Sequence, residues 1–300
     1  MENKGGHAVR LHTCIHEFFG TAFLVLSINS TSINKFQAFA VSIMLLSQIC
    51  YIGPTSGCHL NPAVTIGVLV CEFKQRRVEN IIYAISFAIS QICGAFFGTF
   101  LSFMVQKKDY ETQTIFPGVA SLCPAVADEA QDKDEKCSIK DMHVQAMLAE
   151  LMGTFVLVFI ILTVKYSWGS KDLQINAFVI GTALMSAIAM TANFSGGGLN
   201  PAVAIAQQSF QNIMEANFPG NNNRYMALDA MAVYILAPLG AGAIAGFLQL
   251  YLGNVRNQMQ LAEDEVPKSR SGENNEPLVQ TRKSGDDDKY TKQPEPFKNI

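Results

Sequence analysis

The chain has 300 residues, of which 49% are hydrophobic and 16% charged, and its formal net charge is −3. Its apolar residues lie in runs near the length of about 20 residues that a helix needs to cross a bilayer. Because these runs have no polar face to turn to water, they exclude a soluble bundle of amphipathic helices. The composition therefore predicts an all-α membrane protein, and we expect no nucleic-acid partner.

Six apolar runs are predicted to be transmembrane helices. In chain order they cover roughly 14–30, 35–52, 81–105, 146–164, 175–193 and 229–252. Lysine and arginine cluster in the loops after the second and fourth runs, and short basic loops face the cytoplasm. We therefore expect both termini, residues 1–11 and a disordered polar tail at 254–300, in the cytoplasm. The loop 107–141 then lies outside, where Cys123 and Cys137 either pair or stay free.

One phrase of the sequence is duplicated. The tripeptide Asn-Pro-Ala occurs as Asn61-Pro62-Ala63 and again as Asn200-Pro201-Ala202, each inside the longer pattern Leu-Asn-Pro-Ala-Val-x-Ile. Asn is a preferred N-cap, and Pro is favoured at the first helical position. The apolar segments that follow are too short to cross a membrane. Each copy is therefore predicted to begin a re-entrant half-helix.

A second pattern repeats in the same order. The skeleton Glu-x-x-Gly-Thr-x-x-Leu-Val begins at Glu17 and again at Glu150, so residues 12–106 and 142–253 form two repeats within a channel domain at 12–253. Three crossings in each repeat give the halves opposite orientations, with the functional site at mid-membrane where they meet. Each glutamate is expected to accept hydrogen bonds from backbone amides of the half-helix loop in its own repeat. The alternative role is a proton relay.

These residues together resemble the aquaporin or major intrinsic protein family. The resemblance covers about residues 12–253 and implies six tilted transmembrane helices, two half-helices, a pore in each subunit and a homotetramer. It implies that Asn61 and Asn200 donate hydrogen bonds to a passing water at the central constriction, and that His59 lines the inner vestibule. The implied function is a passive channel for water.

The resemblance also implies a second constriction near the outer mouth. Alignment to the family places Phe39, Ile188, Gly197 and Val203 there, if about two extra residues lie between Gln48 and Asn61. Val203 stands where most members carry Arg, so this chain is an atypical member. The expected filter is apolar and uncharged, which admits small uncharged solutes such as glycerol, urea or ammonia.

Several alternatives stay open. The pore could be selective for glycerol or urea and conduct water poorly, or it could be closed in a structural or adhesion protein. An enzyme is not expected, because the spans hold no nucleophile–base pair. We expect no cofactor or metal either, since the spans hold no cluster of metal ligands. A secondary transporter would need intramembrane charges for ion coupling, and only Glu17 and Glu150 are candidates. The host membrane is the plasma membrane or a vacuolar membrane.

Overall fold

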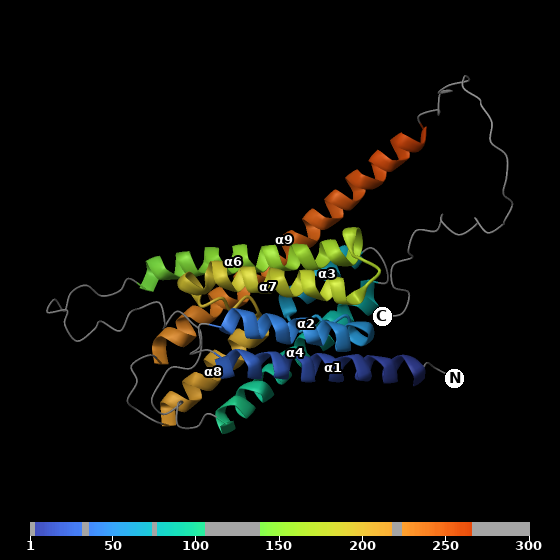
Figure 1. The fold of residues 1–300 in the computed structure, drawn as a ribbon. Coiled ribbons are helices and arrows are strands. Elements are labelled where there is room, and N and C mark those ends of the chain that lie inside the picture. Colours follow the sequence, from blue (N-terminus) through green and yellow to red (C-terminus); the bar gives the residue numbers. More distant parts are fainter. Residues whose placement is uncertain (1–3, 32–35, 74–76, 106–138, 218–223, 266–300) are drawn as a thin grey trace, which may run out of the picture.

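The computed structural model describes residues 4–31, 36–73, 77–105, 139–217 and 224–265, and every regular element in these ranges is a helix (Figure 1). Six of the helices contain a segment long and apolar enough to cross a membrane. They are α1 (Lys4–Thr31), α2 (Gln37–Ser56), α4 (Arg77–Val105), α6 (Ile139–Thr163), α7 (Leu173–Ser195) and α9 (Arg224–Glu265). The prediction of an all-α, six-span membrane protein is confirmed.

Two shorter helices begin at the duplicated prolines, α3 (Pro62–Glu72) and α8 (Pro201–Asn217), and a π-helical turn, η2 (Val164–Trp168), follows α6. Most of the expected outer loop, including Cys123 and Cys137, lies outside the described residues. The start of the tail was wrongly predicted at 254, because α9 continues to Glu265. Residues 254–265 contain good helix formers and no proline, and they extend a helix that is already nucleated.

The two halves of the chain have matching neighbours. Helix α1 packs on α2 and α4 as α6 packs on α7 and α9, and α2 meets α7 at the junction. Figure 1 shows α1, α2, α7 and α6 side by side, with α1 and α6 running in opposite directions. Each short helix also packs on the other half, α3 against α9 and α8 against α4. The inverted arrangement therefore holds both short helices between the halves.

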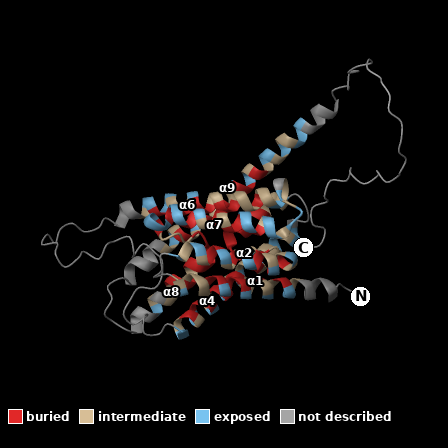
Figure 2. Cartoon of the chain, viewed as in Figure 1, coloured by how far each residue is buried: buried red, intermediate tan, exposed pale blue. Residues whose placement is uncertain are grey.

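Glycines set the closest helix crossings. A Cβ atom at Gly98 of α4 would collide with the carbonyl oxygen of Ala22 in α1, and one at Gly242 of α9 would collide with that of Ala63 in α3. Small residues at such crossings let the backbones approach closely, which is how helices associate where lipid removes the hydrophobic driving force. Figure 2 shows the buried residues on the faces where the helices meet.

Candidate functional site

Both short helices begin at an asparagine cap. Asn61 has extended backbone angles, and its Oδ1 accepts from the Ala63 backbone N–H at 2.8 Å. Asn200 Oδ1 accepts from the Ala202 N–H at 3.0 Å. These are the bonds that an N-cap makes, and the proline at the next position lacks an N–H that would be left unpaired. The local chemistry of Asn-Pro therefore starts both helices at the same point of the repeat.

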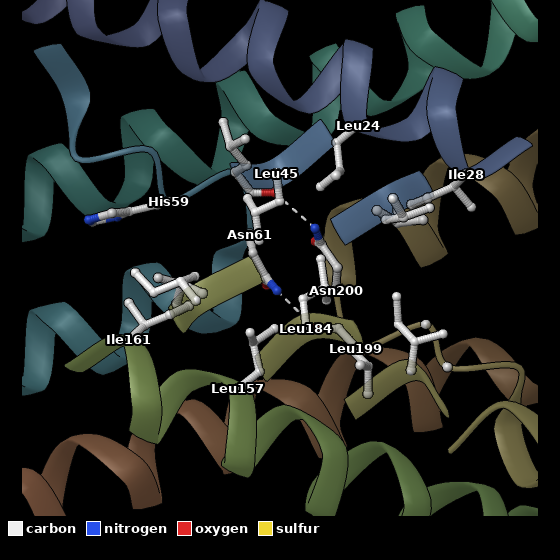
Figure 3. A pocket seen from close by; sticks show the side chains of 18 of the residues that line it. Leu24, Ile28, Leu45, His59, Asn61, Leu157, Ile161, Leu184, Leu199 and Asn200 are labelled. Atoms are coloured by element: carbon white, nitrogen blue, oxygen red, sulfur yellow. Dashed lines mark hydrogen bonds between the residues drawn. The ribbon is translucent and has the colours of Figure 1, made fainter. Parts of the chain in front are cut away.

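The two asparagines also join the halves of the chain. Asn61 Nδ2 donates to the Leu199 carbonyl oxygen at 2.8 Å, and Asn200 Nδ2 donates to the Leu60 carbonyl oxygen at 2.8 Å (Figure 3). An amide nitrogen carries two N–H groups, so each asparagine retains a second donor. Both side chains line the cavity described below. The second donors are therefore in place for a molecule inside it.

Glu17 holds the loop that leads to Asn61. Its Oε1 accepts from Ser56 Oγ at 2.6 Å and from the His59 N–H at 3.0 Å, and its Oε2 accepts from the Leu60 N–H at 2.7 Å and from Gln91 Nε2 at 2.8 Å. The carboxylate is fully buried. Because it is surrounded by four donors, its charge is satisfied without contact with the cavity.

Glu150 makes the corresponding bonds in the second half. Its Oε1 accepts from Ser195 Oγ at 2.6 Å and from the Gly198 N–H at 2.9 Å, and its Oε2 accepts from the Leu199 N–H at 2.6 Å. Where Gln91 contacts Glu17 in the first half, Tyr234 contacts the loop itself in the second half, and its Oη donates to the Ser195 carbonyl oxygen at 2.5 Å. Both glutamates therefore have a positioning role in the structure.

The loops that the glutamates bind are strained at matching positions. Leu60 has a φ of 49° and Leu199 a φ of 50°, in the left-handed region that bulky residues avoid. This conformation aims the carbonyl of each leucine at the asparagine of the other half. Strained backbone of this kind persists only where the surroundings impose it, and here the carboxylate bonds do so.

A cavity of about 90 Å³ runs past both asparagines. Liquid water occupies about 30 Å³ per molecule, so the cavity has room for a few waters. Figure 3 shows His59 and Ile28 at opposite ends, with Asn61 and Asn200 between them. Because Leu24, Leu45, Leu157 and Leu184 surround the asparagines, the wall there is aliphatic. Among the described residues that line the cavity, only Gln37, His59, Asn61 and Asn200 have polar side chains, apart from the thiol of Cys58.

The structure brings three of the four expected filter residues to this cavity: Ile188, Gly197 and Val203. The prediction for Phe39 is wrong, because its side chain is 56% exposed on the outer surface of α2 and Val41 lines the cavity instead. Two residues along a helix turn the side chain by about 200°, so the two positions face opposite ways.

The error came from the two extra residues assumed between Gln48 and Asn61. Val41 of α2 and Ile180 of α7 both line the cavity, and each lies 20 residues before the asparagine of its own half (61 − 41 and 200 − 180). The first half therefore has no insertion relative to the second. A count without a gap would have placed Val41 in the cavity.

His59 lines one end of the cavity. Its Nδ1 lies 3.2 Å from Thr65 Oγ1, and its ring meets Phe87 edge-on, with centroids 5.3 Å apart. In the described part of the chain, no group of His, Cys, Asp and Glu side chains could hold a metal ion.

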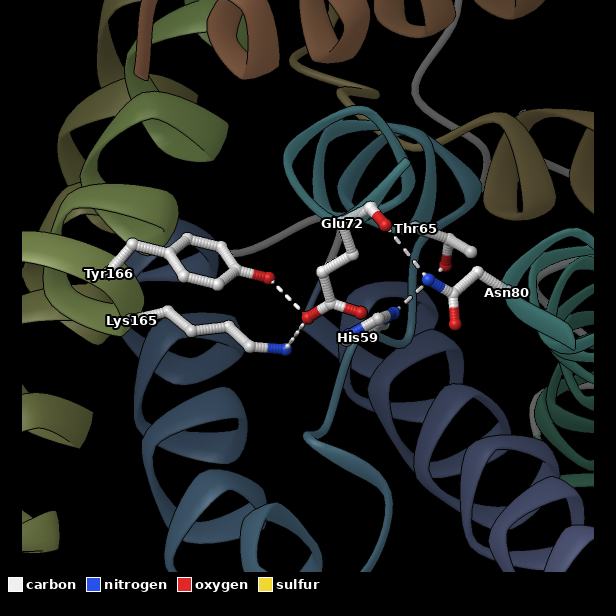
Figure 4. A network of polar contacts seen from close by, with 6 residues as sticks. All are labelled: His59, Thr65, Glu72, Asn80, Lys165 and Tyr166. Carbon is white, nitrogen blue, oxygen red and sulfur yellow. Dashed lines mark hydrogen bonds and ion pairs between the residues drawn. The ribbon is translucent and has the colours of Figure 1, made fainter. Parts of the chain in front are cut away.

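The far end of α3 is held by a polar network (Figure 4). Glu72 accepts from Tyr166 Oη at 2.5 Å and pairs with Lys165 Nζ at 3.5 Å, while Asn80 Nδ2 donates to the Glu72 carbonyl at 3.0 Å. The π-helical turn after α6 supplies both Lys165 and Tyr166. These bonds join the last turn of α3 to α4 and to the second half, so α3 is held at both ends.

Several residues of the site were not predicted from the sequence. Ser56 and Ser195 had a signal, since Ser-Gly-x-x-Leu-Asn-Pro-Ala-Val occurs twice and extends the Asn-Pro-Ala repeat toward the N-terminus. Gln91 and Tyr234 had none. They differ between the halves and reach the loops only through packing of α4 and α9.

The comparisons with known proteins agree with this geometry. The family model for the major intrinsic protein matches residues 7–251. The chain is 27% identical to aquaporin AqpM of Methanothermobacter marburgensis over 270 residues, 80% of this chain and 96% of that protein. It is 29% identical to glycerol uptake facilitator protein-like 6 of Lactiplantibacillus plantarum over 249 residues, 79% of this chain and 96% of that one.

A solved structure shares the fold. The X-ray structure of the aquaglyceroporin from Plasmodium falciparum matches with a TM-score of 0.60 and 15% identity, covering 84% of this chain and 99% of that one. Family model, relatives and architecture agree. The chain therefore belongs to the major intrinsic protein family and is a membrane channel rather than an enzyme.

Proposed function

We propose that this protein is a passive channel for water and for small uncharged solutes such as glycerol, urea or ammonia, and that it excludes protons and ions at the paired asparagines. The observation that carries the proposal is the position of Asn61 and Asn200, whose amide donors meet in the middle of an aliphatic cavity. Relatives of this chain include proteins named aquaporins and a glycerol uptake facilitator.

Proton exclusion follows from the chemistry of the amide donors. A water whose oxygen accepts from both asparagines cannot also accept protons from its two neighbours in single file. The helices α3 and α8 direct their N-terminal ends, with positive partial charge, at the same point. A cation is therefore repelled where the file of waters is interrupted.

Exclusion of other ions follows from the wall. Among the described residues that line the cavity, none carries a fixed charge. An ion would exchange its hydration shell for aliphatic carbon with no counter-charge nearby, which is costly. An uncharged solute with a carbon face loses far less, and the wall favours its passage.

Val203 bears on which solutes pass. Its side chain is 2% exposed, lines the cavity and packs against an apolar cluster that includes Val25, Ala95 and Ala206. An arginine here would place a cation and five N–H donors in the cavity. With valine, this position contributes an uncharged aliphatic side chain, so an uncharged solute meets no guanidinium there.

Assembly and location belong to the same proposal. We propose a homotetramer in the plasma membrane or a vacuolar membrane, with both termini in the cytoplasm. Large apolar side chains such as Phe19, Phe23 and Phe247 are exposed on the helices, which suits a surface in contact with lipid or another subunit.

The test is permeability of the purified protein in liposomes, measured by stopped-flow light scattering for water, glycerol and urea, with proton leak recorded alongside. We expect faster flux of water and of at least one solute than in empty liposomes, with no proton leak. In Val203→Arg we expect solute flux to fall while water flux stays. Solute flux without water flux would favour the solute-selective alternative, for which the aliphatic wall is the specific support. No added permeability at all would overturn the channel proposal and leave the closed-pore alternative.

A further inference from the structure

The lining of the cavity is nearly two-fold symmetric, and its exceptions stand out. Aliphatic residues occur in matched pairs from the two halves, among them Leu24 with Leu157, Ile28 with Ile161 and Val41 with Ile180. The two asparagines match as well. Two polar side chains break the symmetry. His59 corresponds to Gly198 in the repeat, which has no side chain, and Gln37 corresponds to Asn176, which does not line the cavity.

Gln37 stands at the Ile28 end, away from His59. It is the first residue of α2, on the same face as Val41, Leu45 and Ile49, which follow at steps of four residues. Its Nε2 donates to the Ile28 carbonyl oxygen at 3.3 Å. That carbonyl belongs to the last turn of α1, where helical carbonyls lack an i+4 partner. The bond orients the amide and leaves it one N–H and the Oε1 acceptor for other use.

The counterpart in the second half has its amide engaged elsewhere. Asn176 Oδ1 accepts from the Ser170 N–H at 2.7 Å, and Asn176 Nδ2 donates to the Ser170 carbonyl at 2.8 Å. Both ends of this amide close the turn before α7. The comparison shows that the polar group of Gln37 is not required by the repeat. It is a feature of one end of the cavity alone.

We propose that Gln37 is a solute-binding group of this channel, at the end of the cavity where Val203 replaces the expected arginine. This inference rests on the proposed channel function and names the solute class. Apart from the two asparagines, His59 at the opposite end and the thiol of Cys58, Gln37 is the only polar side chain among the described residues that line the cavity, and its bond to Ile28 places it at that end. A solute entering at that end therefore meets one uncharged amide on an aliphatic wall.

The chemistry of an amide defines what it binds. It presents a donor and an acceptor, so it pairs with solutes that also offer both, such as the hydroxyls of small polyols or the N–H and carbonyl groups of ureas. The wall accommodates their carbon atoms. A cation gains little, because an uncharged amide cannot replace its hydration shell in this aliphatic surrounding.

The test compares Gln37→Met with the matched control Gln174→Met. Methionine has the length and unbranched shape of glutamine without its hydrogen bonds. Gln174 is a glutamine exposed near the start of α7 and away from the cavity. In liposomes, we expect urea and glycerol permeability to fall about tenfold in Gln37→Met, as losing roughly one hydrogen bond implies. Water permeability should stay close to wild type, and the control should match wild type for both.

A second variant provides a separate readout in case the first misfolds. Gln37→Glu keeps an acceptor and adds a negative charge at one end of the cavity, while the central barrier to cations is unchanged. We therefore expect guanidinium, a planar cation with the shape of urea, to bind at this end and to slow water flux several-fold in the variant and not in wild type. Melting temperature and monodispersity in detergent show whether each variant is folded. Wild-type solute flux in Gln37→Met, or water flux that guanidinium does not slow in Gln37→Glu, would overturn the role of Gln37 alone. An inert wild type would overturn the channel function itself, and this inference with it.

Discussion

Removing the Glu17 carboxylate should prevent the protein from folding stably. In Glu17→Leu, four buried donors lose their acceptor: Ser56 Oγ, the His59 and Leu60 N–H groups, and Gln91 Nε2. An unsatisfied buried donor costs about 1–3 kcal/mol, so the sum is about 4–12 kcal/mol. That range overlaps the whole folding free energy of a typical domain, about 5–15 kcal/mol. The strained φ of Leu60 would also lose its restraint.

The second half supplies a graded comparison. In Glu150→Leu three donors lose their acceptor, which should lower the free energy of unfolding by about 3–9 kcal/mol. Glu150→Gln keeps one oxygen for Ser195 and Gly198 and leaves only the Leu199 N–H without an acceptor, at about 1–3 kcal/mol. Thermal melting of each purified variant in detergent should therefore rank wild type first, then Glu150→Gln, Glu150→Leu and Glu17→Leu.

Gln174→Leu, which replaces an exposed polar side chain near the start of α7, is the control and should melt near wild type. The reasoning fails if the leucine variants melt like wild type, or if Glu150→Gln loses as much as Glu150→Leu. The same preparations test the proton-relay alternative. Solute flux that depends on a proton gradient in wild type, and loses that dependence in Glu150→Gln, would show that the carboxylate carries protons.

Two further predictions come from the packing. Val41→Phe should narrow the cavity and cut urea and glycerol flux by about tenfold in liposome assays. Phe39→Ala should leave both fluxes unchanged, because this side chain lies outside the cavity. The reverse pattern would restore Phe39 as the filter residue. Gly98→Ala should lower the melting temperature, because the added Cβ would collide with the Ala22 carbonyl of α1. At Gly240 nothing lies within 4 Å of the added Cβ, so Gly240→Ala should keep or raise the melting temperature by removing a flexible residue from a helix. Equal melting of the two alanine variants would show that the α1–α4 crossing tolerates a wider spacing.

Much of the fold could be predicted from the sequence because its signals are local. An apolar run of sufficient length defines a span, whatever surrounds it. Asn followed by Pro defines a helix start through bonds within three residues, which is why Asn61 and Asn200 could be predicted as helix caps. The repeat then supplied the order and opposite orientation of the halves without knowledge of any contact.

The filter residue on α2 could not be obtained in this way. Along α2 the apolar residues continue around the helix, so periodicity does not distinguish the face toward the cavity from the face toward lipid. The family alignment then favoured Phe39 by a gap that the structure does not contain. The packing of α2 between α1 and α7 sets the rotation of α2 about its axis and directs Val41 toward the cavity.

The sequence by itself determined the spans, the duplication and the two asparagine caps, since each depends on residues that are neighbours in the chain. Only the tertiary structure decided which residue of α2 lines the cavity and which side-chain donors reach the buried glutamates. Gln91 lies 74 residues from Glu17, and Gln37 reaches Ile28 across the junction of two helices. Such contacts depend on the rotation of each helix about its own axis, and that rotation is set by the packing of all the helices together.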